Sequence, residues 1–427
     1  PKNAEAPMKQ LLGGLDYLFP HTFLDSNYLF DKDLNNVVPR VGLAWRATGK
    51  TVLRVGYGMY VDAGITNLFV NMGLAAPFYL TNNAVFDRAK APTGQLGNEF
   101  GKVPTFSVQF DPTLSPDKGG FIQAKWAERD YVDGEIHSWN LNIQRLVSKT
   151  LSVQIGYIGN KTNHFPTGYA LNRARPGPGN QQLNRPWPQL FSCDCYHSFG
   201  DGHYHSAQFE LEQRFSKGLS YRAGYTFGRS INNFRWRQDE FDPKGAKALA
   251  DWNRSQTFFF TGVYEIPLGS QLKGMAGGLI KGWQLSGIMG IQSGPPVGVS
   301  VGADIANIGS RRVLLPNRVA DGSLPSDQRT LNRWFDSSAF PLPATYQYGN
   351  AGYNALLGPG LVNVDLALAK RWVFRDRQDM QFRTELFNVA NHANFGKPNG
   401  TVDSGGVGRI TSAGQARQIQ FGLKYSF

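Results

Sequence analysis

The chain has 427 residues, of which 49 are glycine, 13% are aromatic and 18% are charged, with a formal net charge of +12. Its mean hydropathy is −0.35 and it contains no run of 18 apolar residues, which excludes membrane-spanning helices. Lys and Arg are spread over predicted strands and loops without a basic helix or a nucleic-acid motif, so nucleic acid is not predicted as a partner.

In chain order, residues 1–37 are aromatic without a sustained period and are predicted to be a loop. The first hairpin alternates strictly: Val41, Leu43 and Trp45 share one strand face, whereas Arg46 and Arg54 belong to the opposite face. The same period-two pattern recurs along the chain. It predicts eleven strands, at about 38–46, 51–61, 138–147, 151–161, 205–215, 219–231, 255–267, 281–293, 362–374, 379–389 and 417–427.

The connections between these strands alternate between short and long. Short turns such as 148–150, 216–218 and 375–378 are each followed by a long connection, and the long ones are 62–137, 162–204, 232–254, 294–361 and 390–416. Loops longer than about 15 residues are uncommon in compact soluble domains. Transmembrane barrels have this asymmetry, with short periplasmic turns and long extracellular loops, whereas a soluble sandwich or an eleven-stranded soluble can gives no reason for it.

The last stretch, 416–427, supports a membrane barrel independently. Its alternate apolar residues end on an aromatic C-terminus, as in the signal by which outer-membrane barrels are recognised for assembly: Ile419, Phe421, Leu423, Tyr425 and Phe427. The fold class predicted is therefore all-β, an antiparallel transmembrane β-barrel. Because eleven is odd and single-chain barrels have even strand numbers, we expect this to be the C-terminal part of a larger barrel, with residues 1–37 extracellular.

Several segments, read together and in order, resemble the C-terminal half of TonB-dependent outer-membrane receptors, specifically the Oar-like group. They run from about residue 38 to the end and include VPRVGLAW, GKTVLRVGYGMYVD, KGWQLSGIMGIQSGPPVGV and FRTELFNVANHANFGKPNG. The resemblance implies a 22-stranded barrel, of which eleven strands are the second half, and a plug and TonB box that do not occur in this sequence. It also implies location in the outer membrane of a Gram-negative bacterium and energy-coupled uptake of a scarce small ligand or peptide through a TonB-type transducer.

The expected partners are membrane lipids, lipopolysaccharide, whose phosphates would suit the basic charge, and the barrel-assembly machinery. The alternative function is a structural or surface-interaction barrel component without active transport, and an outer-membrane hydrolase is a more distant one. Loop aromatic residues are the candidate ligand contacts: Trp187, Tyr204, Trp236, Tyr346 and Tyr348.

No catalytic constellation, cofactor site or metal site is predicted. The charged strand residues, together with the polar Gln144, are expected to form a hydrated, charge-paired lumen: Glu210, Glu212, Arg222, Glu265, Asp365, Arg383 and Glu385. Cys193 and Cys195 are followed by His197, but the spacing matches no zinc motif of defined geometry. A small loop disulfide and free thiols remain as the two alternatives for these cysteines.

Overall fold

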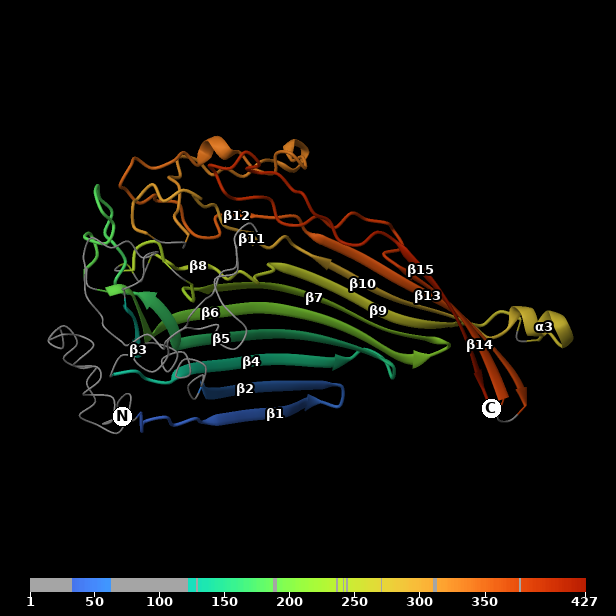
Figure 1. Ribbon diagram of the computed structural model, residues 1–427. Coiled ribbons are helices and arrows are strands. Elements are labelled where there is room, and N and C mark those ends of the chain that lie inside the picture. The colour runs from blue at the N-terminus through green and yellow to red at the C-terminus, as the bar shows by residue number, and fades with distance from the viewer. Residues whose placement is uncertain are drawn as a thin grey trace, which may run out of the picture.

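The computed structural model describes residues 33–62, 122–127, 130–186, 190–235, 237–240, 242, 245–269, 271–309, 313–375 and 378–427. In this part of the chain thirteen strands form one sheet, in which eleven strands follow each other as an antiparallel meander from β1 to β15 (Figure 1). The meander strands are β1 (Arg40–Thr48), β2 (Thr51–Asp62), β4 (Gly134–Leu146), β5 (Leu151–Ala170), β6 (Leu190–Ser216), β7 (Leu219–Asn232), β9 (Gln256–Ile266), β10 (Trp283–Gln292), β13 (Leu361–Arg375), β14 (Gln378–Phe387) and β15 (Gln418–Ser426).

The sheet is an all-β, antiparallel structure, as the alternation predicts, and its strands overlap all eleven expected ranges. Its short turns gather at one end, here called the short-turn end, and the described parts of the long connections at the other, the long-loop end (Figure 1). The β6–β7 turn shows how the backbone conformation of two residues determines which strand residues pair. Lys217 and Gly218 both have positive φ, 51° and 83°, which is the two-residue hairpin turn whose twist matches the strands.

The register places residues of one kind on one face across the whole sheet. Trp45 lies opposite Leu53, and the same row continues through neighbouring strands to Ile143, Ile155, Phe209, Tyr225, Phe258, Ile291 and Val362. We call this side the apolar face. The opposite side, the polar face, carries rows such as Arg54, Asn142, Gly156, Gln208 and Thr226.

Three predicted loop or turn segments are partly regular. Residues 162–204 are not one long loop, because β5 continues to Ala170 and β6 begins at Leu190, so that Cys193, Cys195 and Tyr204 lie on a strand. Within the predicted loop 62–137, β3 (Ile122–Ala127) pairs with β6 in parallel. The predicted turn between β9 and β10 contains helix α3 (Gly274–Ile280). Of the helices in the described ranges, none is long and apolar enough to cross a membrane.

The packed core lies outside the sheet, in a lobe formed by residues 294–360 and 390–417 at the long-loop end. This lobe contains the short strands β11 (Pro296–Val297) and β12 (Leu356–Leu357) and the 3-10 turns η4 (Ser326–Gln328) and η5 (Ser337–Ala339). Its buried cluster is Val297, Val299, Leu315, Phe335, Ala339, Phe340, Ala351 and Leu356. By contrast, apolar side chains of the sheet such as Leu423 (69% exposed) and Phe421 remain uncovered, as expected for a face that contacts lipid.

Candidate functional site

The polar face carries ion pairs and hydrogen bonds, both between neighbouring strands and within one strand. Glu210 on β6 accepts two hydrogen bonds of 2.7 Å from the guanidinium of Arg222 on β7. Arg383 pairs with Glu385 at 2.9 Å along β14, and Arg54 donates to Gln144 at 2.9 Å. These partly exposed pairs each contribute little to stability, about 0–1 kcal/mol. They give the sheet a charge-paired face of the kind expected for a barrel lumen.

At the long-loop end three segments are bound to one another: 171–186, 233–255 and the lobe. Short strand β8 (Ala248–Leu249) pairs with the end of β7 and brings the second segment to the sheet. Asn307 of the lobe donates to the carbonyl oxygens of Gly177 and Gly179, at 2.8 and 3.0 Å. Asn354, also of the lobe, donates to Asp251 at 2.6 Å and to Leu249. The loops therefore form one platform beside the ends of the strands.

Gln238 joins the segment 233–255 to three separate residues of the lobe. Its backbone N–H donates to the hydroxyl oxygen of Tyr353 at 2.6 Å, and its side-chain amide donates to the Gly349 carbonyl at 2.6 Å. Its side-chain oxygen accepts the backbone N–H of Leu315 at 3.1 Å. One amide side chain thus satisfies backbone groups from two distant parts of the lobe, which fixes the 237–240 strap against it.

A hollow of about 420 Å³ opens beside this strap. It is lined by Arg173, Ala174, Arg175, Pro176, Asp239, Glu240 and Tyr348. Arg173 and Glu240 form a buried ion pair of 2.8 Å, and the Arg173 Nη1 also donates to the carbonyl oxygens of Arg237 and Gln238. Burial, together with the charge of Asp239, raises the pKa of Tyr348 to about 12, so its hydroxyl stays a neutral hydrogen-bonding group. The hollow thus offers both signs of charge and one aromatic ring.

A second hollow of about 640 Å³ runs along the polar face near the long-loop end. Tyr204 on β6 lines it together with Asn160, Thr162, Gln208, Phe234, Trp252 and Arg254 among others. Phe234, which forms part of the wall of this hollow, stacks on Phe165 with ring centroids 4.4 Å apart. Gln208 and Thr226 of the polar face line this hollow, so it lies on the same side of the sheet as the ion pairs.

The structure separates the aromatic residues predicted as ligand contacts. Tyr348 and Tyr204 line the two different hollows, Tyr346 is exposed on the lobe and lines neither, and Trp187 and Trp236 lie outside the described residues. Tyr204 was expected on a loop and is instead on strand β6. Sequence reasoning missed Arg173, Gln238 and Glu240, because no spacing in the sequence distinguishes them from other polar loop residues. Among the described residues, no group of three or more His, Cys, Asp or Glu side chains could hold a metal ion.

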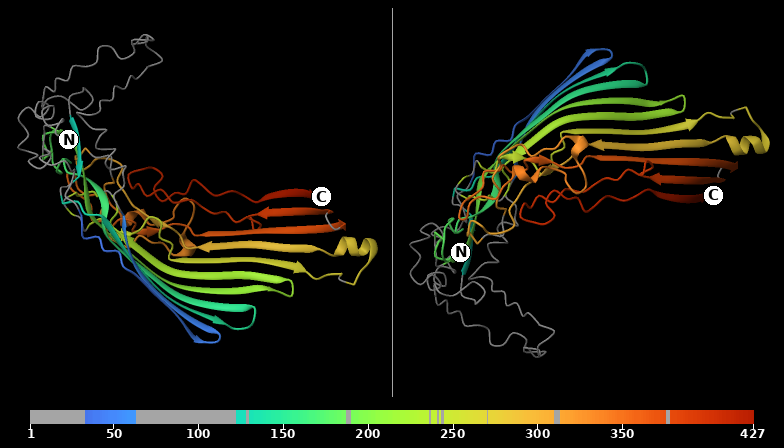
Figure 2. Two further views of the ribbon diagram at one scale, coloured as in Figure 1. Left: turned by 90° about the horizontal axis from the view of Figure 1, so that it is seen from below. Right: turned by 90° about the horizontal axis from the view of Figure 1, so that it is seen from above.

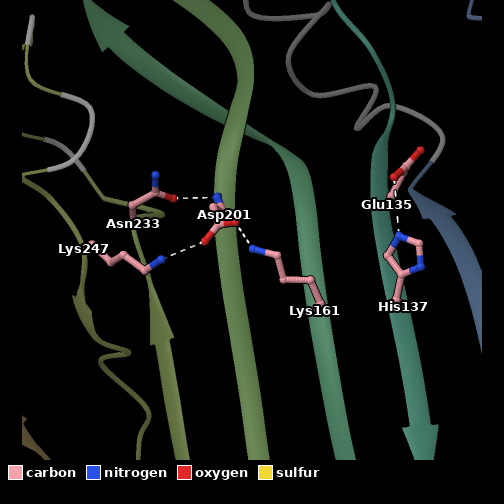
Figure 3. A network of polar contacts seen from close by, with 6 residues as sticks. All are labelled: Glu135, His137, Lys161, Asp201, Asn233 and Lys247. Atoms are coloured by element: carbon pink, nitrogen blue, oxygen red, sulfur yellow. Dashed lines mark hydrogen bonds and ion pairs between the residues drawn. The ribbon is translucent and has the colours of Figure 1, made fainter.

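A basic cluster lies on the apolar-face side of the sheet, at the long-loop end (Figure 3). Asp201 on β6 is bound by both Lys161 and Lys247, and its backbone N–H donates to Asn233 at 2.6 Å. The register places Lys161 and His203 opposite each other, in a row parallel to Trp139 and His205 of the apolar face. Tyr157 and Tyr57 bind His205 and His137 through their hydroxyls, at 2.7 and 2.8 Å. The apolar face therefore ends in a band of aromatic and basic side chains.

The comparison with protein families gives the decisive observation. A family profile described as outer membrane beta barrel domain matches residues 10–420. The chain belongs to this family. As an outer-membrane β-barrel domain it resides in the outer membrane of a Gram-negative bacterium, and the apolar face of its sheet is the side on which such barrels meet lipid. A search of curated protein sequences gives no match.

Several solved structures are similar to this outer-membrane β-barrel chain over most of its length. The ferric-catecholate import receptor Fiu from Escherichia coli K12 is 9% identical, with a TM-score of 0.42 over 91% of this chain and 34% of that one. The ferric preacinetobactin receptor BauA from Acinetobacter baumannii is 12% identical, with a TM-score of 0.44 over 91% and 36%. The outer membrane transporter YddB from E. coli is 10% identical, with a TM-score of 0.46 over 89% and 39%. This chain spans little more than a third of the length of these proteins.

Proposed function

We propose that this outer-membrane barrel chain is the ligand-receiving part of an uptake receptor. The observation that carries the proposal is the platform at the long-loop end, where three connections are bound to one another around the Arg173–Glu240 pair. A surface loop without a binding role needs no core of its own, whereas this lobe buries Phe335 and Phe340 completely. The hollow at Tyr348 and the second hollow, at Tyr204, are the proposed contact sites for a small ligand or peptide.

The energy source proposed for uptake is a TonB-type transducer that acts on a plug domain. The resemblance to the Oar-like group of TonB-dependent receptors supports this proposal, and the charge-paired polar face gives a plug a hydrated surface to contact. The proposed orientation places the platform outside the cell and the short turns in the periplasm, which follows the usual asymmetry of outer-membrane barrels.

The function can be tested by measuring which small molecules and peptides disappear from the culture medium. Cells that produce the full-length protein are compared with cells that lack its gene and with cells that lack the energy transducer. We expect at least one compound to be depleted only when both are present, and Tyr348→Ala to slow that depletion. Tyr346→Ala is the matched control, because Tyr346 is exposed and lines neither hollow. Equal depletion in all strains, with increased detergent sensitivity on gene loss, would instead favour a structural barrel component.

We propose that β1 and β15 pair with further strands in the assembled barrel, as expected for the second half of a 22-stranded structure. Among the described residues the meander ends at these two strands, which do not pair with each other. An unpaired strand edge in hydrocarbon is costly, several kcal/mol for each backbone group. Residues 1–427 refolded in detergent should therefore lack the heat-modifiable gel migration of the intact gene product. A compact, heat-modifiable 1–427 species would contradict this proposal.

The outward row of β15 is proposed to be the signal for the barrel-assembly machinery. Ile419, Phe421, Leu423 and Tyr425 lie opposite Leu386, Thr384, Phe382 and Met380 of β14, and Phe427 follows the strand with its side chain 93% exposed. Phe427→Ser should lower the amount of protein assembled in the outer membrane, whereas Ser426→Ala should not. Equal assembly of both variants, measured in purified outer membranes, would exclude this role.

The basic cluster of Figure 3 is proposed to contact lipopolysaccharide. Lys161 and Lys247 share a single carboxylate, that of Asp201, at the boundary where the aromatic band ends. Phosphate groups of the outer leaflet would pair with the remaining positive charge. Replacing both lysines by Gln should reduce lipopolysaccharide that co-purifies with the protein, whereas Lys149→Gln, in a short turn, should leave it unchanged. Unchanged lipopolysaccharide in the double variant would exclude the contact.

A further inference from the structure

Helix α3 is attached to the sheet by two tryptophans at the short-turn end. The indole N–H of Trp283 donates to the Leu279 carbonyl at 3.0 Å, and that of Trp372 donates to the Gly278 carbonyl at 2.9 Å. Carbonyls in the last turn of a helix have no partner within the helix, so these two bonds satisfy groups that would otherwise need water. Both tryptophans belong to the apolar face, on β10 and β13.

Lys370 holds the two tryptophans in place from the same face. It lies opposite Trp283 in the β10–β13 ladder, and its ammonium is 5.6 Å from the Trp283 ring centroid and 5.4 Å from that of Trp372. The residue is 1% exposed. A cation between two aromatic rings is attracted by both. Two side-chain hydrogen bonds therefore position α3 at the end of the sheet, and Lys370 contacts both tryptophans that donate them.

The outer surface of this helix is apolar and uncovered. Met275 is 89% exposed and Leu279 is 67% exposed, and Leu268 before the helix is exposed as well. Residues 267–284 contain no acidic residue, whereas Lys273 and Lys281 flank the helix. Figures 1 and 2 show α3 beyond the ends of β9 and β10, at the end of the molecule opposite the lobe. It is therefore continuous with the lipid-facing side of the sheet.

We propose that α3 is an interfacial anchor embedded in the phospholipid leaflet of the outer membrane at the short-turn end. A short helix with exposed apolar side chains, flanking lysines and a tryptophan band beneath it has the composition of segments that lie in the headgroup region. Met275 and Leu279 contact the acyl chains near the headgroups, and Lys273 and Lys281 face anionic phosphates. The proposal rests on the outer-membrane location and on the proposed orientation, with the short turns in the periplasm. It does not rest on ligand uptake, so failure of the uptake test would leave it standing.

The test measures the surroundings of residue 275 in the intact protein. Met275→Cys, labelled with bimane and reconstituted in bilayers of phosphatidylethanolamine and phosphatidylglycerol, should be quenched several-fold more by doxyl-labelled phospholipid than by aqueous iodide. Lys149→Cys, in the short turn between β4 and β5, is the matched control at the same end and should show the opposite preference. The unsubstituted chain, labelled in parallel, supplies the background from Cys193 and Cys195.

A second variant separates lipid contact from simple folding of the helix. Replacing Lys273 and Lys281 by Glu should lower quenching by doxyl phospholipid in phosphatidylglycerol bilayers and restore most of it in zwitterionic phosphatidylcholine. Preferential quenching of the residue-275 probe by iodide would overturn the proposal. Protection of the probe from both quenchers would overturn it too, because this would indicate that a protein or a second copy of the chain covers α3.

Discussion

Arg173 and Glu240 form an ion pair of 2.8 Å whose side chains are 4% and 1% exposed, although they come from loops on either side of β6 and β7. A charge pair this well buried is costly to assemble, and removal of one partner takes the opposite charge away from a group that stays buried. Its position beside the Tyr348 hollow means that the shape of the proposed binding site depends on this pair. The pair therefore links local stability to ligand capture.

The first prediction concerns this pair. Glu240→Gln should destabilise the platform by about 3–5 kcal/mol, because the Arg173 charge stays buried while its counter-charge is removed. Backbone amides of the 237–240 strap should then exchange hydrogen on the order of 100-fold faster or more, measured by mass spectrometry of the membrane-embedded protein. Asp321→Asn is the control: it breaks the exposed Arg318–Asp321 pair, which should cost about 1 kcal/mol or less. Similar exchange in both variants would contradict the assignment.

A second prediction follows from Asp403, which joins two parts of the lobe. Its carboxylate accepts the backbone N–H groups of Gly302 and Ala303, at 2.7 and 2.8 Å, and these bonds hold its pKa below the usual range, with the Gly302 bond as the largest cause. A lowered folded-state pKa stabilises the lobe fully above the unfolded value of about 4, and this contribution is lost as pH falls through the folded pKa. Acid should therefore loosen the 298–304 and 399–404 contact before it unfolds the sheet.

The measurement is proteolysis by pepsin between pH 2 and pH 5. In the unsubstituted protein, cleavage near Asp403 should rise as pH decreases below about 4. In Asp403→Asn the cleavage should already be raised at pH 5 and depend less on pH, because the neutral amide cannot replace the charged acceptor. Asp327→Asn, on the exposed turn η4, should behave like the unsubstituted protein. A parallel pH dependence in Asp403→Asn would exclude Asp403 as the titrating group.

The third prediction tests the two faces of the sheet with neighbouring residues of one strand. Leu285 lies on the apolar face, opposite Tyr264 and Leu368, whereas Gln284 lies on the polar face, opposite Glu265 and Ala369. Arg on the lipid face costs about 2–4 kcal/mol at the bilayer midplane. Leu285→Arg should lower the amount of assembled barrel far more than Gln284→Arg, as measured in outer-membrane fractions. Equal tolerance of the two variants would show that the faces are assigned incorrectly.

The sheet could be predicted from the sequence because its two faces differ in chemistry at every second residue. The alternation breaks down where β5 and β6 extend beyond their predicted ends: TNHFPTGYA (162–170) contains Pro166, and the ladder shifts register near Phe165. Backbone pairing with a neighbouring strand, and not side-chain pattern, makes this segment a strand. The long-loop end is thus regular in places where the sequence has no period.

The platform could not be predicted for a related reason. Gln238 binds Leu315 and Gly349, which lie 77 and 111 residues away, through one side-chain amide. Such contacts depend on geometry that no local spacing encodes, and any Gln in a polar loop would look alike. Tyr348 was identified because aromatic side chains on loops are candidate ligand contacts, whereas its neighbours Arg173 and Glu240 were not.

The last prediction concerns which end of the sheet faces the outside of the cell. If the lobe is extracellular, Asp327→Cys on η4 should react with a membrane-impermeant maleimide added to intact cells, because residue 327 is exposed. Lys149→Cys, in the β4–β5 turn, should react only after the outer membrane is opened, since the short turns then lie in the periplasm. Both positions are exposed, so a difference in labelling reports the side of the membrane and not burial of the residue. Labelling of Lys149→Cys but not of Asp327→Cys on intact cells would invert the orientation, and would move the proposed ligand site to the periplasmic side.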